Sequence, residues 1–229
     1  MKTFKRSTII NISIGAALLL LIIVAAGYYA VFTIETSKMS PVDTQELFPG
    51  FYAVKTNYVN FYLIKVNNGD KYIAIDAGGS ASKAKTELQR LHISSDDVIA
   101  VFLTHTHADH VGALRIFDKA SVYAGGYEPS KKASNMLADG ETITVSDLSI
   151  QCMFTPGHSD DSVCYLLDNR YLFAGDTLRL EDNRVGLFHS RFNKSDDIQT
   201  SDIQRLSKLE GIRFIFSAHY GFTDNAVFP

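Results

Sequence analysis

The strongest constraint on what this chain can fold into is a long uncharged stretch near its N-terminus. From Ser7 to Ile34 no charged residue occurs, and residues 16–26 are all alanine, leucine, isoleucine or valine. A helix that crosses the apolar core of a bilayer needs about 20 such residues, whereas the apolar region of a secretory signal is shorter, roughly 7–15 residues. The sequence therefore predicts an uncleaved membrane anchor over residues 1–35, with a cleaved signal and a secreted protein as the alternative.

Charge around this stretch predicts its orientation. Lys2, Lys5 and Arg6 precede it, and no acidic residue occurs before Glu35. Positive charges next to a membrane helix stay on the cytoplasmic side. We therefore expect a single-pass protein of the cell membrane that contacts the lipid bilayer through residues 7–34, with its remaining part outside the cytoplasm.

The rest of the chain has the composition of one globular domain. Residues 36–49 contain few apolar residues and the turn-forming pairs Ser40-Pro41 and Pro49-Gly50, so we expect a linker there and a domain over residues 50–229. Acidic residues outnumber basic ones, 25 to 22, and the domain is more acidic still, because three of the basic residues precede the apolar stretch. Nucleic-acid binders usually carry a basic surface, so the expected partner is a small-molecule substrate and no nucleic acid. The sequence predicts no oligomeric state.

Short strands dominate this domain, and each half also contains helices. The expected hairpin turn is Asn67–Asp70, and the expected helices are 80–92, 109–117 and 195–209, the last with Ile198 on its apolar face. Two sheets packed face to face, with helices on the outside, would satisfy this pattern. Ranges rich in β-branched and aromatic residues predict strands at 51–55, 58–66, 71–75, 98–103, 143–145, 148–154, 162–167, 171–174 and 213–217.

The strongest chemical signal is Thr104-His105-Thr106-His107-Ala108-Asp109-His110, which follows an apolar strand and opens a helix. In an extended segment His105 and His107 point to the same side, and the turn into the helix brings Asp109 and His110 to an adjacent position. Imidazole and carboxylate groups are good zinc ligands, and three of them with a water form an open catalytic site. The motif therefore predicts a catalytic metal site.

Three further candidate ligands stand at the ends of later strands beside small residues. They are His158 in Thr155-Pro156-Gly157-His158, Asp176 after Ala174-Gly175, and His219 after Ser217-Ala218. Each is a weak signal by itself, since a polar residue at a strand end is usually a loop residue. Together they place metal-binding side chains where several strands converge.

In the order and spacing of these residues, the sequence resembles the metallo-β-lactamase-fold hydrolase superfamily, and the glyoxalase-II-like zinc hydrolases within it. The resemblance covers about residues 50–222 and implies a four-layer αβ/βα sandwich. It also implies two Zn²⁺ ions. His105, His107 and His158 would hold the first ion, Asp109, His110 and His219 the second, and Asp176 would bridge both. Asp76, in Asp76-Ala77-Gly78-Gly79, would orient a ligand histidine from behind.

The expected activity is hydrolysis of an ester, thioester, lactone or amide by a metal-bound hydroxide, with Asp109 as the catalytic group that orients the water and passes on its proton. The carboxylate at Asp176 resembles the glyoxalase-II-type enzymes, although one lactamase subclass shares the Asp109-His110 pair. The chain ends soon after His219, where glyoxalase II carries a helical extension that helps bind glutathione, so we do not expect that substrate.

Alternatives remain open at this point. The same site would suit a mononuclear iron enzyme that oxygenates persulfides, a phosphodiesterase, or a metal-stabilised binding module without activity. His189 and Arg191 are weaker candidates for substrate contacts. Cys152 and Cys164 are expected to be buried thiols, with a disulfide as the alternative if their strands are neighbours.

Overall fold

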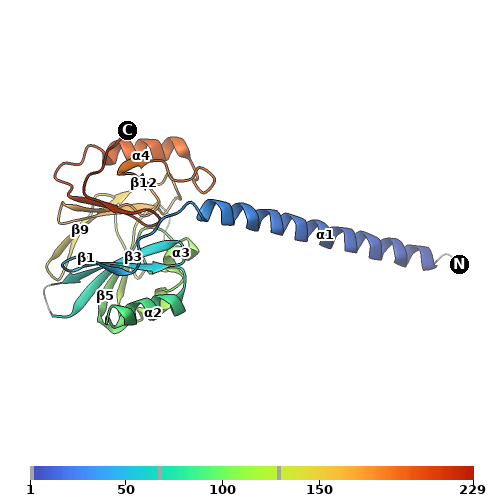
Figure 1. Cartoon of the computed structure of the whole chain (residues 1–229), viewed down its shortest axis with the longest axis horizontal. Helices are drawn as coiled ribbons and strands as arrows, with labels where there is room; N and C mark the ends of the chain where they lie inside the picture. Colours follow the sequence, from blue (N-terminus) through green and yellow to red (C-terminus); the bar gives the residue numbers. More distant parts are fainter. Residues whose placement is uncertain (1–2, 67–68, 128–129) are drawn as a thin grey trace. The chain divides into compact units, whose positions relative to one another are not determined.

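The computed structural model describes residues 3–66, 69–127 and 130–229, without the side chains of residues 3–15. The chain divides into two compact units that meet between Lys38 and Met39. The first unit is the helix α1 (Thr3–Thr36). Within it, Ala16–Thr36 is long and apolar enough to cross a membrane, with a mean hydropathy of 2.4. The second unit contains every strand of the described chain (Figure 1).

One sheet of the second unit has the strand order β1-β2-β3-β4-β5-β6-β7 among the described residues. The strands from β1 to β4 are antiparallel, and β4, β5, β6 and β7 pair in parallel. In chain order its strands are β1 (Gln45–Phe48), β2 (Phe51–Thr56), β3 (Val59–Val66), β4 (Lys71–Ile75), β5 (Val98–Leu103), β6 (Ser121–Ala124) and β7 (Asn135–Met136).

The other large sheet has the order β15-β14-β11-β10-β9-β8, and β12 and β13 form a separate hairpin in the described chain. In this sheet β11 and β14 are parallel neighbours, so their carboxyl ends meet at one edge. The remaining strands are β8 (Thr142–Val145), β9 (Leu148–Phe154), β10 (Val163–Leu167), β11 (Tyr171–Phe173), β12 (Arg179–Glu181), β13 (Arg184–Gly186), β14 (Phe214–Ser217) and β15 (Gly221–Thr223).

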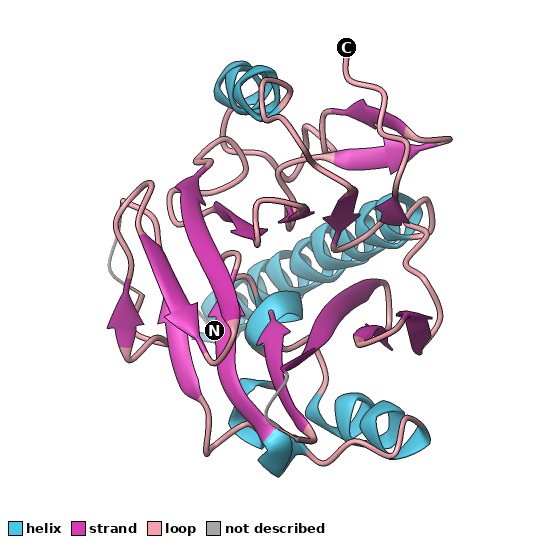
Figure 2. Cartoon of the chain, turned by 90° about the vertical axis from the view of Figure 1, so that its left-hand side faces the viewer, coloured by secondary structure: helices cyan, strands magenta, loops and turns pink. Residues whose placement is uncertain are grey.

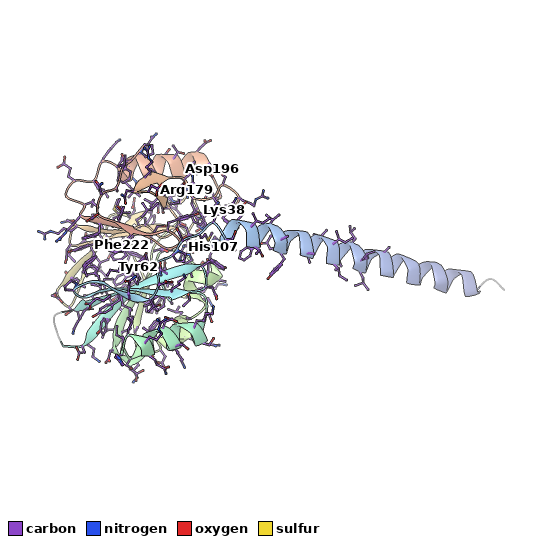
Figure 3. The ribbon with its side chains drawn as sticks, viewed as in Figure 1. Lys38, Tyr62, His107, Arg179, Asp196 and Phe222 are labelled. Carbon is purple, nitrogen blue, oxygen red and sulfur yellow. The ribbon has the colours of Figure 1, made fainter. Side chains whose placement is uncertain are left out.

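Apolar side chains define four layers. One core cluster lies between the two large sheets and includes Tyr62, which Figure 3 labels. The Tyr62 hydroxyl donates to the carbonyl oxygens of Ser217 and Gly221 on the other sheet. A second cluster lies beneath α2 (Ala81–Arg90), and a third beneath α4 (Asp196–Leu206). The two helices therefore cover opposite outer faces of the pair of sheets (Figures 1 and 2). This confirms the predicted αβ/βα sandwich.

Both helices begin where their capping residues predict. The Ser80 side chain accepts from the Lys83 amide at the start of α2, and the Ser195 side chain accepts from the Ile198 amide at the start of α4. The predicted helix 109–117 differs, because it consists of α3 (Ala108–Val111) and a 3-10 turn, η2 (Leu114–Ile116). Between them the Ala113 amide donates to the Gly78 carbonyl, which takes the chain out of the helical hydrogen-bond pattern.

Three other expectations need correction or comment. The expected linker 36–49 contains β1, and the Ser40 amide donates to the His219 carbonyl, so the ordered unit begins before residue 50. The expected hairpin turn 67–70 falls partly outside the described residues. Cys152 faces the core between the sheets and Cys164 faces the cluster beneath α4, so the two thiols point to opposite faces of their sheet and are not joined by a disulfide.

Candidate metal centre

The candidate donors stand where strands of both large sheets end. His105, His107, Asp109 and His110 follow β5, whereas Asp176 follows β11 and His219 follows β14. His158 follows β9. The carboxyl ends of neighbouring parallel strands share one edge of a sheet, and the two sheets face each other there. The structure therefore brings all seven predicted donors together.

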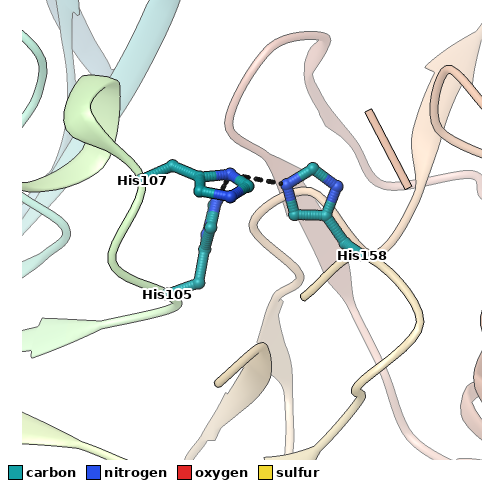
Figure 4. A group of neighbouring side chains, drawn as sticks. All are labelled: His105, His107 and His158. Atoms are coloured by element: carbon teal, nitrogen blue, oxygen red, sulfur yellow. Dashed lines mark hydrogen bonds between the residues drawn. The ribbon is translucent and has the colours of Figure 1, made fainter. Parts of the chain in front are cut away.

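Three histidines form the first group, which we name site 1: His105, His107 and His158. The His107 Nδ1 atom lies 3.0 Å from His105 Nε2 and 3.0 Å from His158 Nε2 (Figure 4). Two ligands bound tetrahedrally to one zinc ion at about 2.0–2.1 Å would lie about 3.3 Å apart. The spacing of these nitrogens therefore fits one shared ion.

Asp109, His110 and His219 form the second group, which we name site 2. The Asp109 Oδ2 atom lies 3.4 Å from His219 Nε2 and 3.9 Å from His110 Nε2. The three donor atoms lie within 4.8 Å of one another, as do those of site 1. These distances again suit donors that surround a common ion.

Asp176 lies between the two groups. Its Oδ2 is 3.4 Å from His158 Nε2 and 3.9 Å from His105 Nε2, both in site 1. Its Oδ1 is 3.3 Å from His110 Nε2 and 3.3 Å from His219 Nε2, both in site 2. One carboxylate thus offers one oxygen to each group, as a bridging ligand does.

Two buried atoms test whether a cation fits. In the part of the chain that the structure describes, His110 Nε2 and Asp176 Oδ1 are the buried side-chain atoms that lack a hydrogen-bond partner. An unsatisfied buried polar group is costly and requires an explanation, and an ion is one of the usual ones. A cation in site 2 would satisfy both atoms, so the donor set fits a metal ion.

Hydrogen bonds behind the histidines determine which ring nitrogen faces the centre. The His219 Nδ1 donates to the Tyr58 carbonyl oxygen at 2.7 Å, and the His110 Nδ1 donates to Asp76 Oδ2 at 2.8 Å. Because these Nδ1 atoms face the acceptors behind them, the Nε2 atoms point into site 2 and are the atoms that would bind an ion there. Asp76 is itself held by the Thr104 amide at 2.7 Å and the Thr104 hydroxyl at 2.8 Å. Asp76 thus lies where the sequence predicts, behind a ligand histidine.

The two groups of donors differ in the pKa shifts of their histidines. Burial lowers the pKa of His105 and of His158, so these two rings of site 1 are neutral and able to bind a metal. Burial also opposes a charge on His110, yet the carboxylates of Asp176, Asp76 and Asp109 raise its pKa well above the ordinary value. The pKa of Asp176 is held well below its ordinary value, against burial, by His219 and His110. Site 2 therefore favours positive charge: in the metal-free centre a proton on His110 Nε2 supplies it, and an ion bound there would displace that proton.

Two of the seven donor residues, His107 and Asp109, are not buried. His107 is exposed, and the Asp109 side chain is 23% exposed, whereas that of Asp176 is only 5% exposed. Of the two carboxylates, Asp109 is therefore the one that a substrate can reach. Its backbone is packed closely, since a Cβ on Gly79 would lie 3.1 Å from the Asp109 Cα.

The two weaker candidates lie farther from the donors. His189 Nε2 contacts the Tyr220 hydroxyl, and the His189 ring packs beside Phe188 at 5.5 Å between centroids. Phe188 in turn contacts the rings of the donors His158, at 5.3 Å, and His219, at 5.4 Å. His189 is thus separated from the donors by one aromatic ring, and Arg191 is exposed in the same loop. A substrate contact by either residue stays a prediction.

Four residues that contact the donor residues are absent from the sequence-based prediction: Tyr58, Phe188, Asn193 and Gln199. Tyr58 stacks on His219, with centroids 5.8 Å apart and ring planes 17° from parallel. The prediction placed Ile198 on the buried face of its helix, but Ile198 is 43% exposed and Gln199 is fully buried. The helical spacing of Gln199, Ile203 and Leu206 is the signal that could have identified this face.

Comparison with known proteins finds similarity to one superfamily. Residues 54–143 match the model of the metallo-beta-lactamase superfamily. A hydroxyacylglutathione hydrolase of Salmonella paratyphi B is 33% identical over 123 residues, which cover 52% of this chain and 47% of that protein. The chain therefore spans about half the length of the curated relatives it matches.

Solved structures match a larger part of the chain. A metallo-beta-lactamase family protein from Thermus thermophilus has a TM-score of 0.59 and 23% identity, covering 78% of this chain and 76% of that one. A subclass B3 metallo-beta-lactamase of Bradyrhizobium japonicum has a TM-score of 0.61 and 20% identity, covering 79% of each chain. At these identities the similarity establishes the fold.

Proposed function

We propose that this chain, a member of the metallo-β-lactamase superfamily by its fold and its matched segment, is a metal-dependent hydrolase that holds two zinc ions. Its substrate would be a small molecule with an ester, thioester, lactone or amide bond. The observation that carries the proposal is Asp176, whose two oxygens face two separate groups of donors at 3.3–3.9 Å. The names of the relatives, a hydroxyacylglutathione hydrolase and metallo-beta-lactamases, support hydrolysis as the reaction class.

The residues of the centre would have different roles. His105, His107 and His158 would hold one ion, His110, His219 and Asp109 the other, and Asp176 would bridge them. Two zinc ions there would supply a Lewis acid for the substrate oxygen and lower the pKa of a water to about 7 or below, from about 15.7. Asp109 would orient this water and carry its proton toward the leaving group, because it is the solvent-accessible carboxylate of the centre.

We also propose that α1 anchors the protein in a membrane. Ala16–Thr36 contains 21 residues, which at about 1.5 Å each match the roughly 30 Å core of a bilayer. The hydroxyl groups of its two threonines are satisfied within the helix, since Thr33 Oγ1 donates to the Tyr29 carbonyl and Thr36 Oγ1 to the Phe32 carbonyl. Lys5 and Arg6 would stay in the cytoplasm and the second unit would lie outside it. Extraction with alkaline carbonate should leave the chain in the membrane fraction, whereas release into the supernatant would contradict an anchor.

Metal analysis tests the metal centre directly. The full-length chain, purified in a mild detergent, should contain about two zinc ions per chain and should hydrolyse at least one member of a panel of esters, thioesters, lactones and β-lactams. A chelator should abolish this turnover, and added zinc should restore it. One iron ion per chain would contradict the zinc proposal, and bound zinc without turnover on the panel would favour a binding module.

A matched pair of variants tests the role of site 1. Substitution His107→Asn should lower turnover by more than about 100-fold, because changes behind a metal ligand already cost about 10–100-fold. His92→Asn is the control, since His92 is exposed and its positive φ of 57° is one that asparagine tolerates. A loss below tenfold in His107→Asn, with zinc retained, would refute the proposed role of site 1.

A further inference from the structure

Helix α4 turns polar side chains, as well as apolar ones, toward the sheet. Gln199 is fully buried and Asp202 is 6% exposed, on the same face as the apolar Ile203 and Leu206. A buried amide is retained in a core only when its hydrogen bonds are satisfied. The partners of Gln199 therefore indicate what this face of α4 holds.

The Gln199 amide joins two loops. Its Nε2 donates to the carbonyl oxygen of Asp176 at 3.1 Å, and its Oε1 accepts from the Phe188 amide at 3.0 Å. A carbonyl accepts only and a backbone amide donates only, so these partners determine which side-chain atom is nitrogen and which is oxygen. Gln199 thus fixes the backbone of the proposed bridging ligand, and also the loop whose Phe188 ring contacts His158 and His219.

A second amide extends the connection to His158. Asn193 Nδ2 donates to Gln199 Oε1 at 2.8 Å and to Asp196 Oδ1 at 2.8 Å, which orients the Asn193 oxygen toward His158. There Asn193 Oδ1 lies 3.3 Å from His158 Nδ1, and it also accepts from Gln199 Nε2 at 3.2 Å. An oxygen at this position requires the proton on His158 Nδ1, so the Nε2 lone pair faces site 1.

Backbone packing fixes α4 against the same loop. The Ser195 amide donates to the Gly157 carbonyl at 2.9 Å, and the Lys194 amide donates to the His158 carbonyl at 3.0 Å. A Cβ on Gly157 would lie 2.4 Å from the Gln199 backbone nitrogen, so only glycine permits this approach. The start of α4 therefore has little freedom to move relative to His158.

We propose that Gln199 is a positioning residue of the metal centre, which holds the backbone of Asp176 directly and the ring of His158 through Asn193. This inference rests on the proposed metal-dependent function. It assigns α4 the task of keeping donors from two separate loops, those after β9 and β11, at the spacing that two ions require. Gln199 itself touches no donor atom, and it acts through the groups that it holds.

Substitution Gln199→Met tests this role, because methionine has a similar shape and volume but no hydrogen-bonding amide. Gln204→Met is the matched control, the same change at an exposed position of the same helix. Zn²⁺ affinity of the full-length chain is measured by competition with a chromophoric chelator, and the geometry of the centre is followed by the visible spectrum of the Co²⁺-substituted protein. Thermal unfolding of the metal-free form is recorded in parallel.

We expect Gln199→Met to weaken Zn²⁺ binding by about 10–100-fold and to change the Co²⁺ spectrum, with Gln204→Met like wild type in both. A merely structural role would lower the unfolding temperature of the metal-free form and leave Zn²⁺ affinity and the Co²⁺ spectrum unchanged, which would overturn the inference. Should Gln199→Met fail to fold, Gln199→Glu keeps the shape and the acceptor for Phe188 but places a carboxylate oxygen against the Asp176 carbonyl. Wild-type Zn²⁺ affinity in folded Gln199→Glu would equally overturn the inference. If the wild type itself binds no zinc, the proposed function fails, and this inference fails with it.

Discussion

Replacing Asp76 by asparagine should weaken the binding of one metal ion and leave the binding of the other unchanged. Asp76 Oδ2 accepts from His110 Nδ1 at 2.8 Å, and Oδ1 accepts from the Thr104 amide at 2.7 Å. In Asp76→Asn the oxygen stays on the Thr104 amide, so an NH₂ group faces His110 Nδ1. The ring must then accept there and carry its proton on Nε2, where it can no longer bind an ion in site 2. The backbone is preserved, because asparagine tolerates the positive φ of 63° at this position.

The size of the effect follows from the bond that is lost. A hydrogen bond to a charged group contributes about 1.5–3 kcal/mol, and each 1.4 kcal/mol corresponds to tenfold in affinity. Zinc binding in site 2 should therefore weaken by about 10–100-fold. His105, His107 and His158 contact one another without Asp76, so binding in site 1 should stay near the wild-type affinity.

Titration of the metal-free full-length chain with zinc, against a chromophoric chelator, measures both affinities. The variant should show one tight site and one weakened site where the wild type shows two tight ones. Asp182→Asn is the control, since Asp182 is exposed and also has a positive φ, 48°. Two sites of wild-type affinity in Asp76→Asn would refute the argument that this carboxylate sets the His110 tautomer.

Three further outcomes are expected. Burial raises the pKa of Asp202 to about 6 from 3.8, so the folded state binds this proton more tightly than the unfolded state does. Its contribution to stability is present below about pH 4 and is lost as the pH rises through 6. The unfolding temperature of Asp202→Asn should therefore rise relative to that of the wild type between about pH 4 and pH 6. A difference between the two unfolding temperatures that does not change with pH would contradict this. Gly157→Ala should lower the unfolding temperature by about 2–12 °C, because overpacking against the Gln199 backbone costs about 1–3 kcal/mol. Gly186→Ala is the control: its added Cβ would lie 3.4 Å from Arg179 Nε, an ordinary contact, so its unfolding temperature should stay close to that of the wild type. Equal unfolding temperatures for the two alanine variants would contradict the close approach. Alkylation of the denatured, unreduced chain should label both cysteines, and a mass without either label would contradict their placement on opposite faces of the sheet.

The sequence was sufficient for the layers and for the seven side chains that the fold brings together, because both depend on local pattern. Apolar runs ending in His, Asp and small residues predict strands that converge on polar side chains, and β5, β11 and β14 end in this way. The local pattern was misleading where a residue distant in the sequence determines the backbone conformation. The helix predicted after Asp109 is interrupted because the Ala113 amide donates to the carbonyl of the distant Gly78.

The network behind the donors was beyond local pattern for the same reason. In the sequence Gln199 is one of several polar residues in a charged helix. Its role becomes visible only in the fold, where its side chain forms hydrogen bonds with the backbones of Asp176 and Phe188 from other loops. Likewise, β1 could not be distinguished from a linker, since its pairing with β2 across a short turn supplies most of the reason for its conformation.

The split of the donors between the two sheets has a consequence for biogenesis. A growing polypeptide that has been synthesised only as far as β10 contains His105, His107 and His158, but neither Asp176 nor His219. In the proposed centre such an intermediate already contains all three histidines of site 1, whereas site 2 is complete only once β11 and β14 have been added. Metal loading would thus be ordered in time, with the last-made strands admitting the ion that completes the centre.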